Sequence, residues 1–306
     1  MADNPDSVFF IDSELVERLM RGDTADLTKK KPRASEVSAL ATALKLANAG
    51  KLDEAIGELE AAATRGENPG DIYGAIGHIR FEQQNWEAAT DCYIRVAESD
   101  EKHPTAFYNL GLCLERRAMF EEAAEAFESA VAIDSSRWQA SLGRGLSLLN
   151  LGQNEKALEP LDAALKASPG QDRALFGKAV ALHKLGKWKE ATDLYRKILP
   201  SNPNSPELLA NLVGVSTAAK DDASTREFAT RLLKLRSHSR PALEALVAME
   251  LASEEYESAV QHASQLVKVA PDSYPGWFNL GIALHKTGRR EQIGRASCRE
   301  RVLVQV

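Results

Sequence analysis

Several features are scarce or missing in this 306-residue chain, and each shortage excludes a class of protein. Its three cysteines (Cys92, Cys113 and Cys298) include no close pair, so they predict reduced thiols rather than a disulfide framework or a zinc site. No stretch approaches about 18 consecutive apolar residues, and the opening MADNPDSVFF lacks the cationic and apolar regions of a secretion signal. We therefore expect a cytoplasmic protein with no membrane partner.

An excess of positive charge is missing as well. The net charge is −6, which gives no basic surface for nucleic acid to bind. Aromatic residues make up only 6% of the chain, while alanine and leucine are abundant, and this favours closely packed helices over a β-rich core. With 44% apolar and 27% charged residues, the chain has enough of both for a folded, all-α protein.

Motifs that carry chemistry are also absent from the sequence. It contains no HExxH, GxSxG, P-loop or CxxC pattern. Six histidines are scattered along the chain, and no two have metal-ligand spacing on one helix: His78, His103, His183, His238, His262 and His285. We expect no catalytic residue, no cofactor and no metal site, and hence a protein that is not an enzyme.

What the sequence does contain is a repeat of 34 residues. The segments 85–93, 119–127, 153–161 and 187–195 are similar and begin 34 residues apart. The same spacing places repeat starts at Glu36, Gly70, Pro104, Trp138, Asp172, Pro206, Arg240 and Tyr274. Seven repeats are complete and the eighth is truncated.

Within a repeat, apolar and small residues recur at the spacing of two helical faces. Repeat three shows the pattern best, with Phe107, Leu110, Gly111 and Leu114 followed by Ala123, Phe127 and Ala130. This arrangement resembles the tetratricopeptide repeat over residues 36–291. The resemblance implies an all-α solenoid of helical hairpins, wound as a right-handed superhelix with a concave and a convex side.

Turn residues support the repeat, and a few positions depart from it. Glycine occupies the fifteenth position of four repeats, and proline the thirty-second position of three. Repeat six has Lys220 at the turn and Thr225 at the small position, so its helix boundaries are hard to predict. Pro160 falls inside the second helix of repeat four, where we expect a bend rather than a break.

The two ends of the chain lie outside the repeats. Residues 1–35 predict a short helix capped by Ser13, which either covers the end of repeat one or docks on another protein. The run Lys29–Arg33 is a solvated linker or, alternatively, a localisation or polyanion-binding signal. In the tail, 292–306, residues 292–302 resemble a translated sequencing adapter, so we expect this tail to be an artefact and the natural protein to continue differently.

The resemblance also implies where a partner binds, because the concave side of such a solenoid is lined by fixed positions of each first helix. In repeats three to five the fifth and ninth positions are apolar and flank Gly143 and Gly177: Tyr108, Leu112, Leu142, Leu146, Phe176 and Val180. Arg116, His183 and Lys184 are predicted along the edge. The alternative is tighter coiling, in which neighbouring helices bury these side chains.

These positions predict a non-enzymatic scaffold or adaptor that binds a peptide or helix of a partner protein in the groove. The Lys and Asn pair of a carboxylate clamp is missing, and the family's asparagine ladder is broken. One alternative is a substrate-recruiting region of a larger enzyme, such as a transferase. Another is self-association through a C-terminal repeat that lacks its cap.

Overall fold

The computed structural model describes residues 34–289, and within these it contains helices and no strand. In chain order the helices are α2 (Ala34–Asn48), α3 (Leu52–Thr64), α4 (Pro69–Glu82), α5 (Trp86–Ser99), α6 (Pro104–Arg116), α7 (Phe120–Ile133), α8 (Trp138–Asn150), α9 (Asn154–Ala167), α10 (Asp172–Lys184), α11 (Trp188–Ile198), α12 (Pro206–Ala218), α13 (Asp222–Leu235), α14 (Arg240–Ala252), α15 (Tyr256–Val269) and α16 (Tyr274–Lys286). The predicted N-terminal helix, the basic run and the tail lie outside the described residues.

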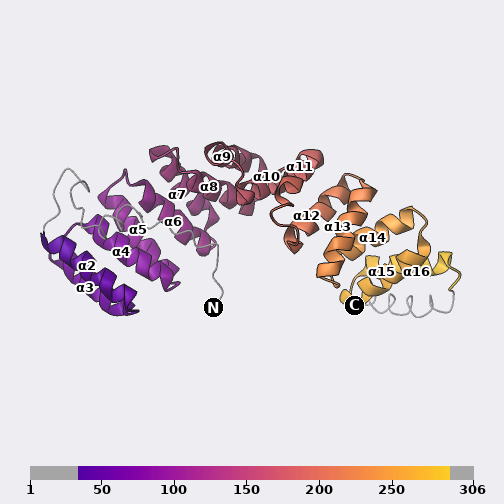
Figure 1. The fold of residues 1–306 in the computed structure, drawn as a ribbon, viewed down its shortest axis with the longest axis horizontal. Helices are drawn as coiled ribbons and strands as arrows, with labels where there is room; N and C mark the ends of the chain where they lie inside the picture. Colours follow the sequence, from indigo (N-terminus) through magenta and orange to yellow (C-terminus); the bar gives the residue numbers. More distant parts are fainter. Residues whose placement is uncertain (1–33, 290–306) are drawn as a thin grey trace. The chain divides into compact units, whose positions relative to one another are not determined.

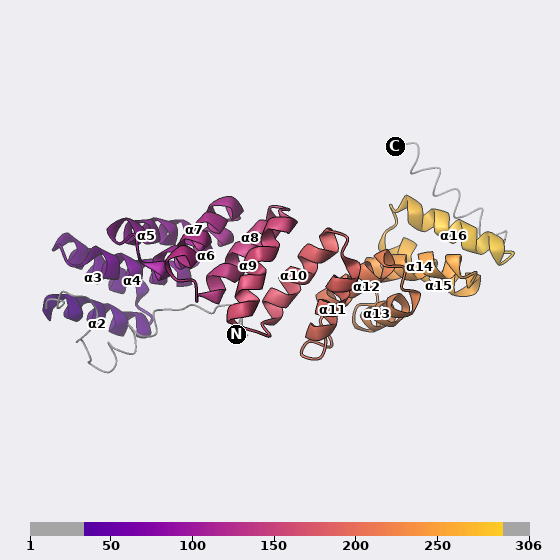
Figure 2. The same cartoon turned by 90° about the horizontal axis from the view of Figure 1, so that it is seen from above.

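The helices form the predicted hairpins, one pair for each of the seven complete repeats (Figure 1). The chain divides into two compact units, of which the first ends at Ala174 and the second begins at Leu175. In the first unit each helix from α2 to α9 packs on the next, and in the second the same holds from α11 to α16 (Figure 2). Seven helix pairs are followed by α16, the first helix of repeat eight, so the all-α repeat fold is confirmed. No helix among the described residues is long and apolar enough to cross a membrane.

The helix starts follow from local sequence. Five first helices have proline in their first turn, where the missing N–H costs nothing: α4, α6, α12, α14 and α16. Asn85, Ser205 and Asp221 cap their helices, and each side chain accepts a hydrogen bond from the backbone N–H of the third helical residue. These caps satisfy N–H groups that a helix leaves without an internal partner.

The fifteenth position of every repeat adopts the left-handed conformation. Four repeats have the predicted glycine there, with φ between 72° and 75°. The others hold Gln84, Ala118, Lys220 and Glu254, with φ between 56° and 61°. The turn of repeat six therefore closes as in its neighbours: Asp221 N–H donates to the Ser216 carbonyl at 2.9 Å. The packing of the two helices fixes this backbone even where the residue is not glycine.

The twentieth position supplies the close contact between paired helices. It is alanine in six of the seven complete repeats, and each of these alanines is 0% exposed: Ala55, Ala89, Ala123, Ala157, Ala191 and Ala259. Repeat six has Thr225, which is 2% exposed and donates its hydroxyl hydrogen bond to Ser216 Oγ at 3.0 Å. The larger, polar side chain is tolerated because its one donor is satisfied inside the core.

Two prolines affect second helices in different ways. Pro160 lies inside α9, which continues to Ala167, so the helix persists as expected. Pro200 lies two residues beyond the end of α11, which has 11 residues where α5, α7, α9, α13 and α15 each have 14. A proline has no N–H for the helix ladder and its ring clashes with the preceding turn, so α11 ends early.

Candidate functional site

The predicted groove residues lie on three first helices. Some of these residues belong to the first unit and the others to the second. Tyr108, Leu112 and Arg116 lie on α6, and Leu142 and Leu146 on α8, all within the first unit. The second unit holds the part of α10 that carries Phe176, Val180, His183 and Lys184. Each set is described within its own unit.

Two of the predicted groove residues are core residues. Tyr108 is 5% exposed and Leu142 is 6% exposed, so the expectation that they offer open apolar surface is wrong. The ring of Tyr108 lies 5.8 Å from that of Phe127, on the second helix of the same repeat. Tyr108 therefore stabilises the helix pair and cannot anchor a ligand without leaving the core.

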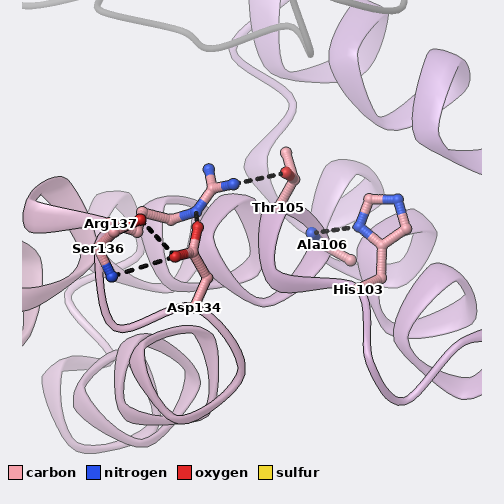
Figure 3. A network of polar contacts seen from close by, with 6 residues as sticks. All are labelled: His103, Thr105, Ala106, Asp134, Ser136 and Arg137. Atoms are coloured by element: carbon pink, nitrogen blue, oxygen red, sulfur yellow. Dashed lines mark hydrogen bonds and ion pairs between the residues drawn. The ribbon is translucent and has the colours of Figure 1, made fainter.

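Arg137 contacts Thr105 and Asp134 (Figure 3), and its guanidinium also lies near the ring of Tyr108. Its Nη2 donates to Thr105 Oγ1 at 3.1 Å, its Nε lies 3.6 Å from Asp134 Oδ2, and its guanidinium carbon lies 5.9 Å from the Tyr108 ring centroid. Asp134 is itself fixed by Ser136, whose hydroxyl and backbone N–H donate to Oδ1, and these bonds lower the pKa of the carboxyl. This network joins the turn after α7 to the start of α6, so it connects the two ends of repeat three.

Gly143 does not open the groove either. A β-carbon on this residue would lie 2.6 Å from Cζ of Phe127, so the ring of α7 occupies the space beside the α8 backbone. The space beside Gly143 is filled by the preceding repeat and leaves no room for a ligand. Tight packing between neighbouring repeats is the physical reason.

Of the predicted groove residues in the first unit, Leu112, Leu146 and Arg116 keep exposed area, and these three are here called the first-helix surface. Leu112 and Leu146 occupy the ninth position of consecutive first helices and are half-buried. Arg116 is exposed, with its guanidinium 6.0 Å from the Trp86 ring centroid. Apolar area flanked by a charge is typical of a protein-binding surface.

Arginines act on two residues of α6, Glu115 and Tyr108. Burial raises the pKa of Glu115, while Arg173 and Arg116 act in the opposite direction. Burial also raises the pKa of Tyr108, against the influence of Arg173 and Arg137. Neither Arg137, which precedes α8, nor Arg173, which occupies the second position of repeat five in α10, was named from the sequence.

In the second unit, the α10 residues differ in exposure. Phe176 is half-buried and packs edge-on against Tyr195, with ring centroids 5.6 Å apart. Val180 and His183 are also half-buried, and Lys184 is exposed. Burial lowers the pKa of His183, and Lys184 adds to this effect. His183 packs close to Gly214, where a β-carbon would lie 3.3 Å from its Cε1.

The described residues contain no group of three or more His, Cys, Asp or Glu side chains placed to hold a metal ion. In the first unit, the first and second helices of the repeats differ in charge. The first helices α2, α4, α6 and α8 carry four acidic and four basic residues, whereas the second helices α3, α5, α7 and α9 carry fourteen acidic and three basic ones. The first helices of this unit are thus close to neutral in net charge, whereas its second helices are strongly acidic.

Comparison with known proteins supports the repeat assignment. Residues 75–137 and 138–206 match the family described as tetratricopeptide repeat. No curated protein matches the sequence.

Several solved structures share the fold. The C-terminal part of a TPR repeat-containing protein from Cytophaga hutchinsonii has a TM-score of 0.64 at 14% identity, covering 79% of this chain and 99% of that one. A tetratricopeptide repeat protein from Parabacteroides merdae has a TM-score of 0.56 at 16% identity, covering 82% and 99%. YrrB, described as a TPR protein with an unusual peptide-binding site, has a TM-score of 0.53 at 21% identity, covering 57% and 90%. At these identities the likeness shows a shared fold.

Proposed function

The chain is a tetratricopeptide repeat protein, and we propose that it is a non-enzymatic scaffold that binds a segment of a partner protein on its first-helix surface. The observation that carries this proposal is the pair of half-buried leucines, Leu112 and Leu146, at the same position of consecutive first helices. Neighbouring repeats thereby present apolar area at a regular spacing, which suits an extended peptide or one face of a helix. Arg116 beside them would pair with an acidic group of the ligand.

Two further observations support the proposal. The first helices carry little net charge, so apolar contact on them is not opposed by a strong field. YrrB, which shares the fold, is described as having a peptide-binding site. We place the protein in the cytoplasm, since Cys92 and Cys113 are free thiols and that compartment keeps thiols reduced.

The test is a selection of peptides from a random phage-displayed library on the immobilised full chain. The selected peptides are then titrated against Leu112→Glu and Leu146→Glu variants, in which a carboxylate replaces apolar contact area. We expect each substitution to weaken binding by about tenfold or more, as truncation of an interface anchor does.

Leu151→Glu is the matched control. Leu151 is 37% exposed and lies at the C-terminal end of α8, away from the ninth position. The same substitution there should leave peptide binding unchanged. Circular dichroism and thermal melts establish that all three variants are folded. If the selected peptides bind Leu112→Glu and Leu146→Glu as tightly as the unmodified chain, the proposed surface is wrong.

A second candidate function is self-association through α16, and one observation favours it. Tyr274 and Phe278 are 47% and 49% exposed, and their rings stack at a centroid distance of 6.1 Å. Exposed aromatic pairs of this kind are common at protein interfaces. Sedimentation velocity over a range of concentrations should show an oligomer that Phe278→Glu dissociates. A monomer at every concentration would exclude this function.

A further inference from the structure

The second unit contains a hollow between α11 and α13 that is lined by two arginines. It has a volume of about 500 Å³ and is lined by Arg196, Leu199, Pro200, Pro203, Glu227, Phe228 and Arg231. All of these residues come from second helices and the turn after α11, so the hollow is separate from the first-helix surface.

The hollow results from the early end of α11. Pro200 is the twenty-ninth residue of its repeat, and the residue at this position is helical in each of the other six complete repeats. The chain therefore leaves the helix at Ile198 and turns through Pro200 and Pro203. Arg231 ties this turn to α13 by donating from Nη2 to the Pro203 carbonyl at 2.9 Å. The turn leaves Leu199 and the two prolines lining the hollow next to α13.

Both arginines of the hollow are held in place. Nη2 of Arg196 donates to Ser224 Oγ at 2.8 Å, and its guanidinium carbon lies 6.0 Å from the Phe228 ring centroid. Nη1 of Arg231 lies 3.4 Å from Glu227 Oε1, which is the single acidic group in the lining. Asp221 is close enough to Arg196 for that arginine to lower its pKa, although the bonds from Ser224 contribute more. Two guanidinium groups that are already oriented lose little conformational freedom when they bind a ligand.

A second hollow, two repeats earlier, carries more acidic than basic residues and includes residues of α8 in its lining. It lies between α7 and α9, has a volume of about 370 Å³, and is lined by four glutamates, Arg144 and Lys156 among other residues. The twenty-fifth residue of the repeat is Glu128 in this hollow and Arg196 in the later one. The twenty-fifth position of the repeat thus presents a carboxylate in one hollow and a guanidinium in the other.

We propose that the hollow between α11 and α13 binds an acidic segment of a partner protein. Carboxylates of that segment meet Arg196 and Arg231, which offer planar, charged donors to such groups. An apolar side chain next to the carboxylates covers Leu199 and Pro200. A peptide segment suits this site because the hollow combines two separated cations with an apolar wall, and a single small anion would leave that wall bare.

The test uses the full chain and a fluorescent synthetic peptide that repeats the triplet Glu-Glu-Leu, with a Lys-Lys-Leu peptide as its counterpart. Fluorescence anisotropy at low and high salt measures binding. We expect the acidic peptide to bind, to weaken as salt screens the charges, and to lose about tenfold in affinity in Arg196→Gln and in Arg231→Gln. Because Arg231 also holds the turn, Arg196→Gln is the cleaner variant.

Arg144→Gln is the matched control, since it removes the same charge from the hollow between α7 and α9. It should leave binding of the acidic peptide within about twofold of the unmodified chain. The proposal is overturned if the acidic peptide fails to bind, if Arg196→Gln and Arg144→Gln weaken it equally, or if the basic peptide binds as tightly. Displacement of the acidic peptide by inorganic phosphate at constant ionic strength would also overturn it, because the ligand would then be a free anion.

Discussion

The ring of Phe127 fills the space in which a β-carbon of Gly143 would stand, with Cζ only 2.6 Å from that position. The same ring lies 2.7 Å from the corresponding position at Gly111. Phe127 is 0% exposed. One aromatic side chain is therefore enclosed by the first helices of repeats three and four, and it joins the two repeats.

Gly143→Ala should destabilise the protein, although alanine is the better helix former. In an open helix, alanine in place of glycine stabilises by about 1 kcal/mol. Here the added methyl group meets the buried ring, and overpacking of this kind costs about 1–3 kcal/mol. We expect a net loss of about 1 kcal/mol or more in the free energy of unfolding, measured by urea titration.

Gly57→Ala is the control for this substitution. Gly57 lies within α3, and no atom stands within 4 Å of its added β-carbon. This variant should be more stable than the unmodified chain, because only helix propensity changes. Equal shifts in the same direction for both glycines would contradict the packing argument.

Lys220→Gly should stabilise the protein. Lys220 has φ of 56°, a left-handed conformation that costs a residue with a side chain about 1 kcal/mol relative to glycine. The reverse change, Gly152→Ala, should destabilise by a similar amount, since Gly152 has φ of 72° and open space around it. The midpoint temperatures of thermal unfolding should rise for Lys220→Gly and fall for Gly152→Ala. An unchanged melt for Lys220→Gly would mean that its side chain supplies a compensating contact.

Cys92 and Cys113 should be unreactive in the folded protein. Both are buried, and burial raises the pKa of Cys92 to about 11 and that of Cys113 to about 12. A raised thiol pKa leaves almost no thiolate at pH 8, and the thiolate is the reactive form. In a Cys298→Ser variant, a thiol reagent such as DTNB should label nothing until denaturant is added, and then two thiols.

A cysteine introduced as Leu151→Cys is the positive control for that experiment, because Leu151 is 37% exposed. It should react at once in the folded chain. Rapid labelling of Cys92 or Cys113 under the same conditions would show that α5 or α6 opens readily.

His262 is expected to be the residue that makes buried Glu250 tolerable. Nδ1 of His262 lies 2.9 Å from both carboxylate oxygens of Glu250, whose side chain is 1% exposed. His262→Ala would leave that carboxylate without its partner, which costs about 3 kcal/mol for a buried group. Chemical denaturation of the full chain measures the loss.

The double variant Glu250→Leu/His262→Leu tests whether the loss of stability comes from the unpartnered carboxylate. It removes the buried carboxylate together with its partner, and such replacements are often neutral. We expect its stability to lie close to that of the unmodified chain and well above that of His262→Ala. A double variant as unstable as His262→Ala would mean that the two residues stabilise the α14 and α15 pair through shape rather than charge.

The sequence by itself determined the repeat architecture. A spacing of 34 residues and small residues at fixed positions predict helix pairs, and α2 to α16 follow the predicted repeats. The pattern is readable because each helix must bury one apolar face, and that requirement is local to the helix. Glycine at the turn was likewise a local signal, and it identified the left-handed positions in four repeats.

The tertiary structure alone decided which apolar side chains remain open to a partner. Tyr108 and Leu112 share α6 and one repeat pattern, yet Tyr108 is buried by Phe127 and by Arg137 while Leu112 keeps part of its surface. The tertiary structure also decided the backbone of Lys220, which is left-handed because the packed helix pair imposes that conformation. Exposure depends on contacts between residues far apart in the chain, and a periodic sequence does not encode how closely successive repeats approach.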